Sequence, residues 1–397
     1  MSNAQRNFGF FGDNASTDAF GRLRTSDPFI LYDHQFQYGK GELFWNEKTT
    51  GGASSTHIAS ESSVELSVTS TNDEIIRQSK KYNRYVPGKS QLIFFTFVLG
   101  AGDDGVRKRA GYFDDNNGIY LENIGSSLKW VVRSKTGVSV SANEANQTDW
   151  NIERYNNIDI TKAQIAVIDI EWLGVGRVRV GFVVDGKIVY VHEFLHANNT
   201  SKVYMTTANL PIRYEIKRIS GTGVATLKQI CCSVSSEGGY EKRGLSFSAS
   251  NGTVGYTLSG RRPILSIRPK TTFNSIENRI LVEPKNIELL ATANPVFYEV
   301  IYNGTLTGGS FSGVSSSSCV EYDATATNIT GGTVIRTGYV GAGIGQSAQV
   351  QSPDLLNKIV LGLNIDGNSQ DLLTIVATNI GNNPVAYGNI TWLESQD

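Results

Sequence analysis

The stretch that most constrains the fold of this 397-residue chain runs from residue 165 to residue 196. Within it, apolar and charged residues alternate twice, first through Ile168–Trp172 and then through Arg177–Phe182. A period of two residues is typical of a β-strand with one buried face. Asp185 and Gly186 follow between β-branched residues, and this dipeptide favours a type I′ hairpin turn because both positions take a positive φ. The stretch therefore predicts a three-stranded antiparallel meander.

Other short strand patterns follow one another along the chain, separated by turn residues rather than by helical periodicity. They cover Gln35–Trp45, Ser63–Val68, Gln91–Leu99, Gly118–Glu122, Leu128–Arg133, Leu210–Lys217, Ile264–Ile267, Val296–Tyr302, Thr333–Val340, Lys358–Leu363, Leu372–Thr378 and Ala386–Leu393. Glycine contributes 41 residues, which suits strands joined by tight turns. We therefore expect an all-β protein, with a concanavalin-like jelly-roll sandwich followed by a second, smaller β-sandwich domain.

The length of the chain predicts more than one domain, because a single hydrophobic core rarely serves more than about 250–300 residues. We expect an extended N-terminal docking arm at residues 1–35 and the jelly-roll sandwich at residues 36–240. A Ser- and Gly-rich segment then marks a linker at residues 241–262. The C-terminal β-domain follows at residues 263–397.

The N-terminal arm carries aromatic and basic side chains in a segment too short to bury them in a core of its own. These residues are Phe8, Phe10, Phe11, Phe20, Arg22 and Arg24. Apolar side chains in such an arm need a surface to cover. The sequence leaves two surfaces open, the chain's own sandwich and a neighbouring subunit. We assign the six residues to a docking interface as a hypothesis.

Charge and hydropathy argue against nucleic-acid and membrane partners. The net charge is -1 at pH 7, so no global field draws the chain to nucleic acid or to an anionic membrane. No apolar run approaches the ~20 residues of a membrane-spanning helix, and the first residues lack the apolar core of a secretory signal. The three cysteines form neither a disulfide framework nor a Cys-x-x-Cys metal site. We expect a chain made in a reducing cytoplasm, or assembled there into something larger.

Residues 192–196 match the zinc-protease pattern His-Glu-x-x-His. In such enzymes the two histidines lie one helical turn apart and bind one ion at about 2.0–2.1 Å. Here the pattern follows directly on the strand after the Asp185-Gly186 turn, and four residues along a strand separate side chains by ~13 Å. We therefore expect His192 and His196 to lie in a strand and its following loop, without zinc.

Two further polar groups have a structural interpretation. Residues 114–118, Asp-Asp-Asn-Asn-Gly, offer oxygen ligands for calcium, but a β-turn requires the same residue types, and we favour the turn. A dense basic patch spans residues 77–84 and is interleaved with tyrosines. The near-neutral chain gives this patch little support as a nucleic-acid site. We expect it to be a solvated strand face or an interface to an acidic neighbour.

No catalytic constellation stands out in the sequence. There is no Gly-x-Ser-x-Gly elbow, and no glycine loop has the strand-before, helix-after context of a phosphate site. A glycosidase stays open as a class, but nothing selects its acid and its base among the many carboxylates. We expect no catalytic residue, no cofactor and no metal, and a protein that is not an enzyme.

Several short strings resemble those of a family of uncharacterised virion structural proteins from tailed bacteriophages. They lie at residues 85–91, 108–113, 117–119, 147–151, 172–178 and 210–215. The likeness covers residues 15 to 320 approximately and is weakest toward the C-terminus. It implies a capsid, tail or fibre component with a lectin-like β-sandwich, and it transfers no catalytic residue.

On this resemblance we predict a bacteriophage virion structural protein, a tail, fibre or capsid-appendage subunit. We expect it to be made in the host bacterial cytoplasm and to be located in the virion. It would form a homo-oligomer, with a trimer favoured, and dock on other virion structural proteins through its arm. The alternative is a carbohydrate-binding module that recognises a host surface glycan.

Overall fold

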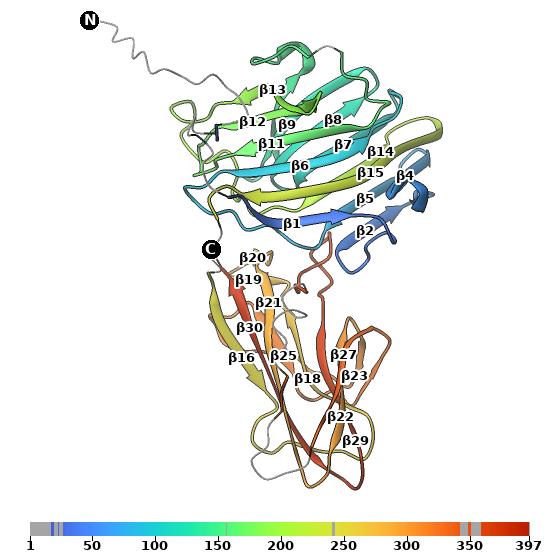
Figure 1. Cartoon of the computed structure of the whole chain (residues 1–397), viewed down its shortest axis with the longest axis vertical. Helices are drawn as coiled ribbons and strands as arrows, with labels where there is room; N and C mark the ends of the chain where they lie inside the picture. Colours follow the sequence, from blue (N-terminus) through green and yellow to red (C-terminus); the bar gives the residue numbers. More distant parts are fainter. Residues whose placement is uncertain are drawn as a thin grey trace, which may run out of the picture. The chain divides into compact units, whose positions relative to one another are not determined.

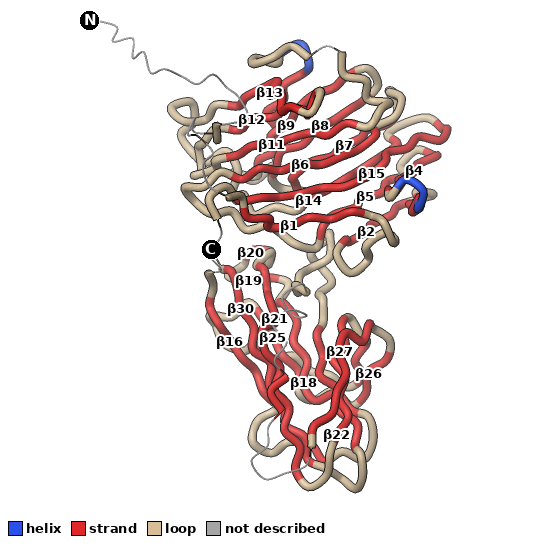
Figure 2. The backbone as a smooth tube through the Cα atoms, in the orientation of Figure 1, coloured by secondary structure: helices blue, strands red, loops and turns tan. Residues whose placement is uncertain are grey.

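The computed structural model describes residues 17–19, 23, 27–155, 157–239, 243–341, 348–350 and 359–396. Across these residues the helical segments are two single 3-10 turns, η1 (Ala59–Glu61) and η2 (Gln147–Asp149), and strands dominate the rest (Figure 2). The predicted all-β fold is confirmed. The chain divides into two compact units, Met1–Glu241 and Lys242–Asp397.

The first unit consists of two antiparallel sheets, which Figure 1 shows as separate layers. Sheet I has the order β13-β12-β11-β6-β15-β4-β3, with β1 also paired to β15. Its strands are β1 (Phe29–Gln35), β3 (Ser54–Ile58), β4 (Ser63–Ser70), β6 (Gln91–Val98), β11 (Gln164–Ile170), β12 (Val178–Val184), β13 (Lys187–Phe194) and β15 (Thr222–Ser236). The predicted jelly-roll sandwich is confirmed.

Sheet II lies against sheet I and has the order β10-β9-β8-β7-β14-β5-β2. Its strands are β2 (Trp45–Thr50), β5 (Glu74–Ser79), β7 (Val106–Phe113), β8 (Gly118–Ile124), β9 (Ser127–Ser134), β10 (Ser141–Asn146) and β14 (Ile212–Arg218). All its neighbouring strands pair antiparallel.

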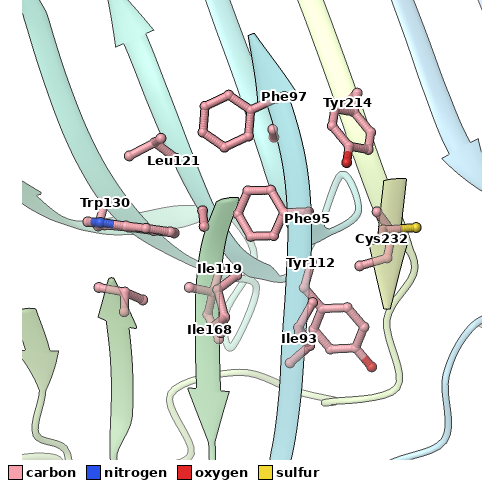
Figure 3. Close-up of a cluster of buried hydrophobic side chains, with 14 of the residues drawn as sticks. Ile93, Phe95, Phe97, Tyr112, Ile119, Leu121, Trp130, Ile168, Tyr214 and Cys232 are labelled. Atoms are coloured by element: carbon pink, nitrogen blue, oxygen red, sulfur yellow. The ribbon is translucent and has the colours of Figure 1, made fainter. Parts of the chain in front are cut away.

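The core between the two sheets is built from the apolar positions of the period-two pattern. Phe95 and Phe97 on β6 are fully buried, and Figure 3 shows them beside Trp130 and Leu121 of sheet II. The Phe95 and Trp130 rings meet edge to face with centroids 6.3 Å apart. Full burial of an apolar side chain of this size stabilises the fold by about 1.5–3 kcal/mol.

The predicted meander is confirmed as β11, β12 and β13, paired in that order. Asp185 and Gly186 form its second turn with φ values of 50° and 75°. Both lie in the left-handed region that a type I′ turn requires.

The basic patch at residues 77–84 is not a solvated strand face, so that prediction is wrong. Arg77 shares the inner face of β5 with the core residue Ile75 and is 2% exposed. Its Nε donates to Gln229 Oε1 of sheet I at 2.8 Å, and its Nη1 forms an ion pair with Glu47. The strand alternation places this cation in the core, where polar partners offset its loss of hydration.

A second cation, Lys108, also points into the sandwich. It shares the inner face of β7 with Ala110, and its Nζ donates to the carbonyl oxygens of Leu99 and Ala101. Burial lowers the pKa of Lys108 to about 8, although Asp103 nearby opposes the shift.

The second unit is the predicted smaller β-sandwich. Sheet III has the order β16-β30-β21-β28 with β17 on β30, and sheet IV has the order β24-β25-β18-β29-β22-β27. The strands of sheet III are β16 (Leu245–Ser250), β17 (Tyr256–Thr257), β21 (Leu281–Thr292), β28 (Ala348–Val350) and β30 (Val385–Ser395). Those of sheet IV are β18 (Arg262–Pro269), β22 (Val296–Tyr302), β24 (Ser312–Gly313), β25 (Val320–Asp323), β27 (Thr333–Val340) and β29 (Leu373–Asn379).

Two short ribbons complete this unit. They pair β19 (Thr272–Phe273) with β20 (Ile276–Glu277), and β23 (Thr305–Thr307) with β26 (Asn328–Thr330). Fully or almost fully buried side chains from both sheets form one core, including Trp392 of sheet III and Ile264 of sheet IV.

Strands also occupy parts of the segments expected to be arm and linker. Residues 29–35, at the end of the expected arm, form β1 and pair with β15 of sheet I. Residues 245–250, inside the expected linker, form β16 and pair with β30 of sheet III.

Candidate functional site

The outer face of sheet II carries an array of charged side chains. On β7 the alternate residues Val106 and Ala110 belong to the core, so Arg107 and Arg109 point outward. The same alternation on the neighbouring strands completes a set that we name the charged face. It comprises Arg107, Arg109, Phe113, Tyr120, Glu122, Lys129, Arg133, Arg213, Glu215 and Lys217.

Strand register aligns four of these residues into one row across four strands. Glu215 of β14 faces Arg109 of β7, Arg109 faces Glu122 of β8, and Glu122 faces Lys129 of β9. The distances are 3.2 Å from Arg109 Nη1 to Glu215 Oε1, 2.5 Å from Arg109 Nε to Glu122 Oε2, and 3.1 Å from Lys129 Nζ to Glu122 Oε1. Opposite charges directly across a sheet attract, with about 0.2–1 kcal/mol per pair. We name this row the charge ladder.

Further arginines surround Glu215. Arg107 Nη2 lies 2.8 Å from its Oε1 and Arg213 Nε lies 3.7 Å from its Oε2. Burial alone would raise the pKa of Glu215, but Arg213, Arg109 and Arg107 hold it at about 2. Glu122 behaves similarly, because the attraction of Arg109 and Lys129 outweighs burial and lowers its pKa. Both carboxylates are therefore ionised at neutral pH and accept hydrogen bonds.

One end of the charged face is closed by arginines over aromatic rings. The Phe113 and Tyr120 rings have centroids 4.5 Å apart, and the Arg133 guanidinium lies 5.4 Å and 4.9 Å from them. Arg213 approaches Phe113 at 5.4 Å. Such cation–π contacts hold the guanidinium groups in fixed planes.

The loop after β7 covers this closed end. Asp114 Oδ1 accepts hydrogen bonds from the backbone amides of Asn116 and Asn117, both at 2.8 Å, which confirms the predicted turn. Asp115 on the same loop forms an ion pair with Arg213 at 2.7 Å. The other end, around Arg107, Arg109 and Lys129, is partly open to solvent.

Part of the outer face of sheet I, around Arg177 and Arg179, is covered by the chain itself. Arg179 Nη2 donates to the carbonyl oxygen of Thr17, and Arg177 Nε donates to that of Ala19, each at 2.6 Å. Beneath them Arg179 pairs with the fully buried Asp169 at 2.6 Å. Residues 17–19 thus lie on the chain's own sandwich.

The six predicted docking residues, Phe8, Phe10, Phe11, Phe20, Arg22 and Arg24, lie outside the described residues. Their role in an interface stays a prediction.

The histidines of the His-Glu-x-x-His pattern have separate surroundings, as predicted. His192 lies on β13 and meets the Phe194 ring edge to face, with centroids 4.5 Å apart. His196 lies in the following loop, where it stacks on Tyr204 at 3.8 Å and its Nδ1 lies 2.9 Å from the Gly176 carbonyl oxygen. Burial lowers the pKa of both. In the part of the chain that the structure describes, no three His, Cys, Asp or Glu side chains are grouped as a metal site would require.

None of the helical turns within the described ranges has the length and apolar character needed to cross a membrane.

Comparisons with known proteins find distant likenesses among solved structures only. No protein-family model and no curated protein matches the chain. A glycoside hydrolase family 16 endo-glucanase from Bacteroides ovatus is 11% identical, with a TM-score of 0.35, over 52% of this chain and 100% of its own. The CBM2 module of an evolved Dit from Lactobacillus casei BL23 phage J-1 is 8% identical, with a TM-score of 0.34, over 54% and 99%.

Lectin I-B4 from Griffonia simplicifolia is 12% identical, with a TM-score of 0.29, over 52% of this chain and 99% of its own. At such identities the likeness concerns the fold alone. The β-sandwich implied by the resemblance is present in the structure, whereas membership of the virion family stays a prediction.

The expectation from the sequence that the chain is not an enzyme is contradicted by the solved structures that are similar to it. Solved structures similar to it include several glycoside hydrolases and a transglycosylase. Function depends on sites placed on a fold, and folding can assemble carboxylates that no linear motif reveals. Glu122 and Glu215 are such a case, because both contact Arg109 although 93 positions separate them in the sequence.

Proposed function

We propose that this protein binds glycans and that the charged face of sheet II is its binding surface. The observation that carries the proposal is the charge ladder, in which hydrogen-bond donors and acceptors alternate across four adjacent strands. Sugar hydroxyls both donate and accept hydrogen bonds. The partly exposed Arg109 and Lys129 therefore offer donors to sugar hydroxyls, and the ionised carboxylates beneath them fix the positions of these donors.

The rigidity of the face supports this role. Binding groups are effective when their rotamers are fixed before the ligand arrives, because less conformational entropy is lost on binding. Arg109 is held by ion pairs to Glu215 and Glu122, and its guanidinium lies 5.1 Å from the Tyr120 ring centroid. Sheet strands, rather than loops, position all of these residues.

A glycan array with the full chain tests the proposal, followed by calorimetry on the best ligand. We expect Arg109→Gln to weaken binding by about tenfold, which corresponds to about 1.4 kcal/mol. The matched control is Lys228→Gln, because Lys228 forms a comparable ion pair with Glu61 at 2.7 Å but lies on sheet I. Thermal unfolding of each variant confirms that it is folded.

The outcomes separate the alternatives. Absence of binding to every glycan by the folded chain, or unchanged binding by Arg109→Gln, would overturn the proposal. Release of new reducing ends from a bound glycan would show that the same face also carries catalysis.

We further infer that this binding takes place in a bacteriophage virion, in a homo-oligomer that docks on other virion proteins. The resemblance of residues 85–91 and 172–178 to tailed-phage virion proteins supports this placement. Phage appendages are commonly closed symmetric assemblies in which arms and sheet edges are buried between subunits. Location in the virion and assembly as a trimer are parts of the same proposal.

Light scattering on the full chain and on a variant lacking residues 1–16 tests the assembly. The truncation removes Phe8, Phe10 and Phe11 but stops before Thr17, whose carbonyl oxygen accepts a hydrogen bond from Arg179. We expect a trimer for the full chain and a smaller species for the truncation. A monomer in both samples would contradict the proposed role of the arm in self-assembly.

A further inference from the structure

The charges of the charged face lie at two depths. The side chains of Glu122 and Glu215 are each 4% exposed. Those of Arg107, Lys129 and Lys217 are 24%, 17% and 33% exposed. The carboxylates therefore form a floor, and the cations form the layer that solvent meets.

Carboxylates with greater exposure lie around this cationic layer. Glu144 on the edge strand β10 pairs with Lys129 at 2.7 Å, and Asp115 in the loop after β7 pairs with Arg213. Glu74 on β5 lies 3.5 Å from Lys217. These acids lie at the margins of the face, and Arg107 and Lys129 remain partly exposed cations between them.

Two arginines of the charged face retain capacity for a ligand. The ion pairs of Arg107 with Glu215 and Glu74 are both made through Nη2, at 2.8 Å and 3.7 Å. Arg109 lies two positions along the same strand, about 7 Å away. A guanidinium has five N–H donors, so the carboxylate contacts of Arg107 and Arg109 do not use all the donors of either group.

The chemistry of these groups favours an anion. Arginine presents a planar fork that matches the geometry of a carboxylate or phosphate, and hydrogen bonds between charged partners are stronger than neutral ones. A neutral sugar would satisfy donors but leave the exposed positive charge uncompensated. An anionic sugar substituent would accept hydrogen bonds from these donors and also compensate the positive charge.

We propose that the glycan bound by the charged face is anionic, carrying carboxylate or phosphate groups, and that Arg107, Arg109 and Lys129 bind these groups. This inference rests on the proposed glycan-binding function and specifies its ligand class. The floor carboxylates Glu122 and Glu215 hold the cations in position.

Titration of the full chain with matched polysaccharides tests the inference. One pair is polygalacturonate and its fully methyl-esterified form, and the other is phosphomannan and neutral mannan. We expect the anionic member of at least one pair to bind at least tenfold more tightly. We also expect its affinity to fall between 50 and 500 mM salt, because salt screens interactions between partly exposed charges. The preferred pair distinguishes a carboxylate from a phosphate.

Two charge-removing variants locate the interaction. Arg107→Gln and Lys129→Gln should each weaken binding of the anionic polymer at least threefold, with thermal unfolding showing that both are folded. Lys228→Gln removes a cation from sheet I and should bind as the unaltered chain does. Equal weakening by all three variants would overturn the assignment to the charged face.

The inference and the function on which it rests fail in different ways. Equal affinity for the members of both pairs, without salt dependence, would overturn the anionic ligand and leave glycan binding in place. If Arg107→Gln and Lys129→Gln leave the preference for the anionic polysaccharide unchanged, the assignment of these residues to the binding site is overturned. Absence of binding to any of the four polymers and to a broad glycan array would remove the function as well.

Discussion

The outer faces of sheet I and sheet II both carry cross-strand ion pairs, but these pairs differ in their burial. On sheet I, Asp169 and Arg179 face each other across β11 and β12 and are completely buried beneath residues 17–19. On sheet II, Glu122 and Lys129 face each other across β8 and β9, with the lysine partly exposed. Cross-strand ion pairs thus stabilise the sandwich where other residues bury them, and they remain partly accessible to solvent where no described segment covers them.

The two surroundings imply different energies. Removing one partner of a buried pair leaves an uncompensated charge and costs about 3–5 kcal/mol. Exposed pairs contribute about 0–1 kcal/mol because water and salt screen them. Substitutions on the two faces should therefore differ strongly in their effect on the free energy of unfolding.

The largest effect is expected for Asp169→Ala. The substitution leaves Arg179 buried without the carboxylate 2.6 Å away, and we expect the free energy of unfolding to fall by about 3–5 kcal/mol. Urea denaturation followed by fluorescence measures this change. A loss below 1 kcal/mol would remove the distinction between the two faces.

Glu215→Gln should have the next largest effect, and the effect should depend on pH. The pKa of Glu215 is about 2 in the folded chain and near 4.5 in the unfolded chain. A lowered carboxyl pKa stabilises the folded state above pH 4.5, and this stabilisation is lost as the pH falls toward 2. The difference corresponds to about 3 kcal/mol. We expect Glu215→Gln to be less stable than the unaltered chain at pH 7 and to approach its stability near pH 2. A constant difference across this window would contradict the assigned pKa.

Removal of the segment that covers sheet I should have an intermediate effect. A variant lacking residues 1–19 loses the carbonyl oxygens of Thr17 and Ala19 that accept from Arg179 and Arg177. A hydrogen bond to a charged group contributes about 1.5–3 kcal/mol, and water that reaches the uncovered arginines recovers part of this loss. The variant lacking residues 1–16 keeps both carbonyls and should unfold at the same urea concentration as the full chain. Equal loss in both truncations would show that the covering contacts contribute little.

The smallest effect on stability is expected for Lys129→Gln. Its pairs with Glu122 and Glu144 are partly exposed, so we expect a change below about 1 kcal/mol in the free energy of unfolding. The same variant should lose affinity for an anionic polysaccharide, which calorimetry measures. A large loss of stability would place Lys129 among the structural pairs instead.

The sequence predicts strands well where the period of two is uninterrupted. The meander at residues 165–196 is predictable because apolar residues alternate regularly along β11 and β12 and the Asp185-Gly186 turn follows, although the register shifts once between β12 and β13. β5 and β7 were not predicted, since buried cations, Arg77 and Lys108, occupy inner positions that the pattern requires to be apolar. A buried charge is satisfied by partners distant in the sequence, and so no local pattern identifies it.

Bulges account for the two longest strands that were missed. In β15 the register shifts between Gln229 and Cys232, and in β21 it shifts between Pro284 and Asn286. An extra residue moves the apolar positions to the other face, which interrupts the alternation. A proline also argues against a strand unless it lies at a bulge or an edge.

The charge ladder itself could not be predicted from the sequence. Its members lie on four strands, and Arg109 is 13 positions from Glu122 but 106 from Glu215. Only sheet order and register bring them into one row. The local signals of a charged outer face are the alternations of β7, with Arg107 and Arg109 on one side, and of β14, with Arg213, Glu215 and Lys217 on one side.

The two depths of charge also bear on how such a surface changes under selection. The floor carboxylates Glu122 and Glu215 support the sheet, whereas Lys129 of the upper layer, whose ion pairs are partly exposed, contributes little to folding. Proteins are stable by only about 5–15 kcal/mol, so substitutions confined to that upper layer remain within the margin. On the proposed function, ligand preference can therefore diverge among descendants of this chain while the scaffold beneath is conserved.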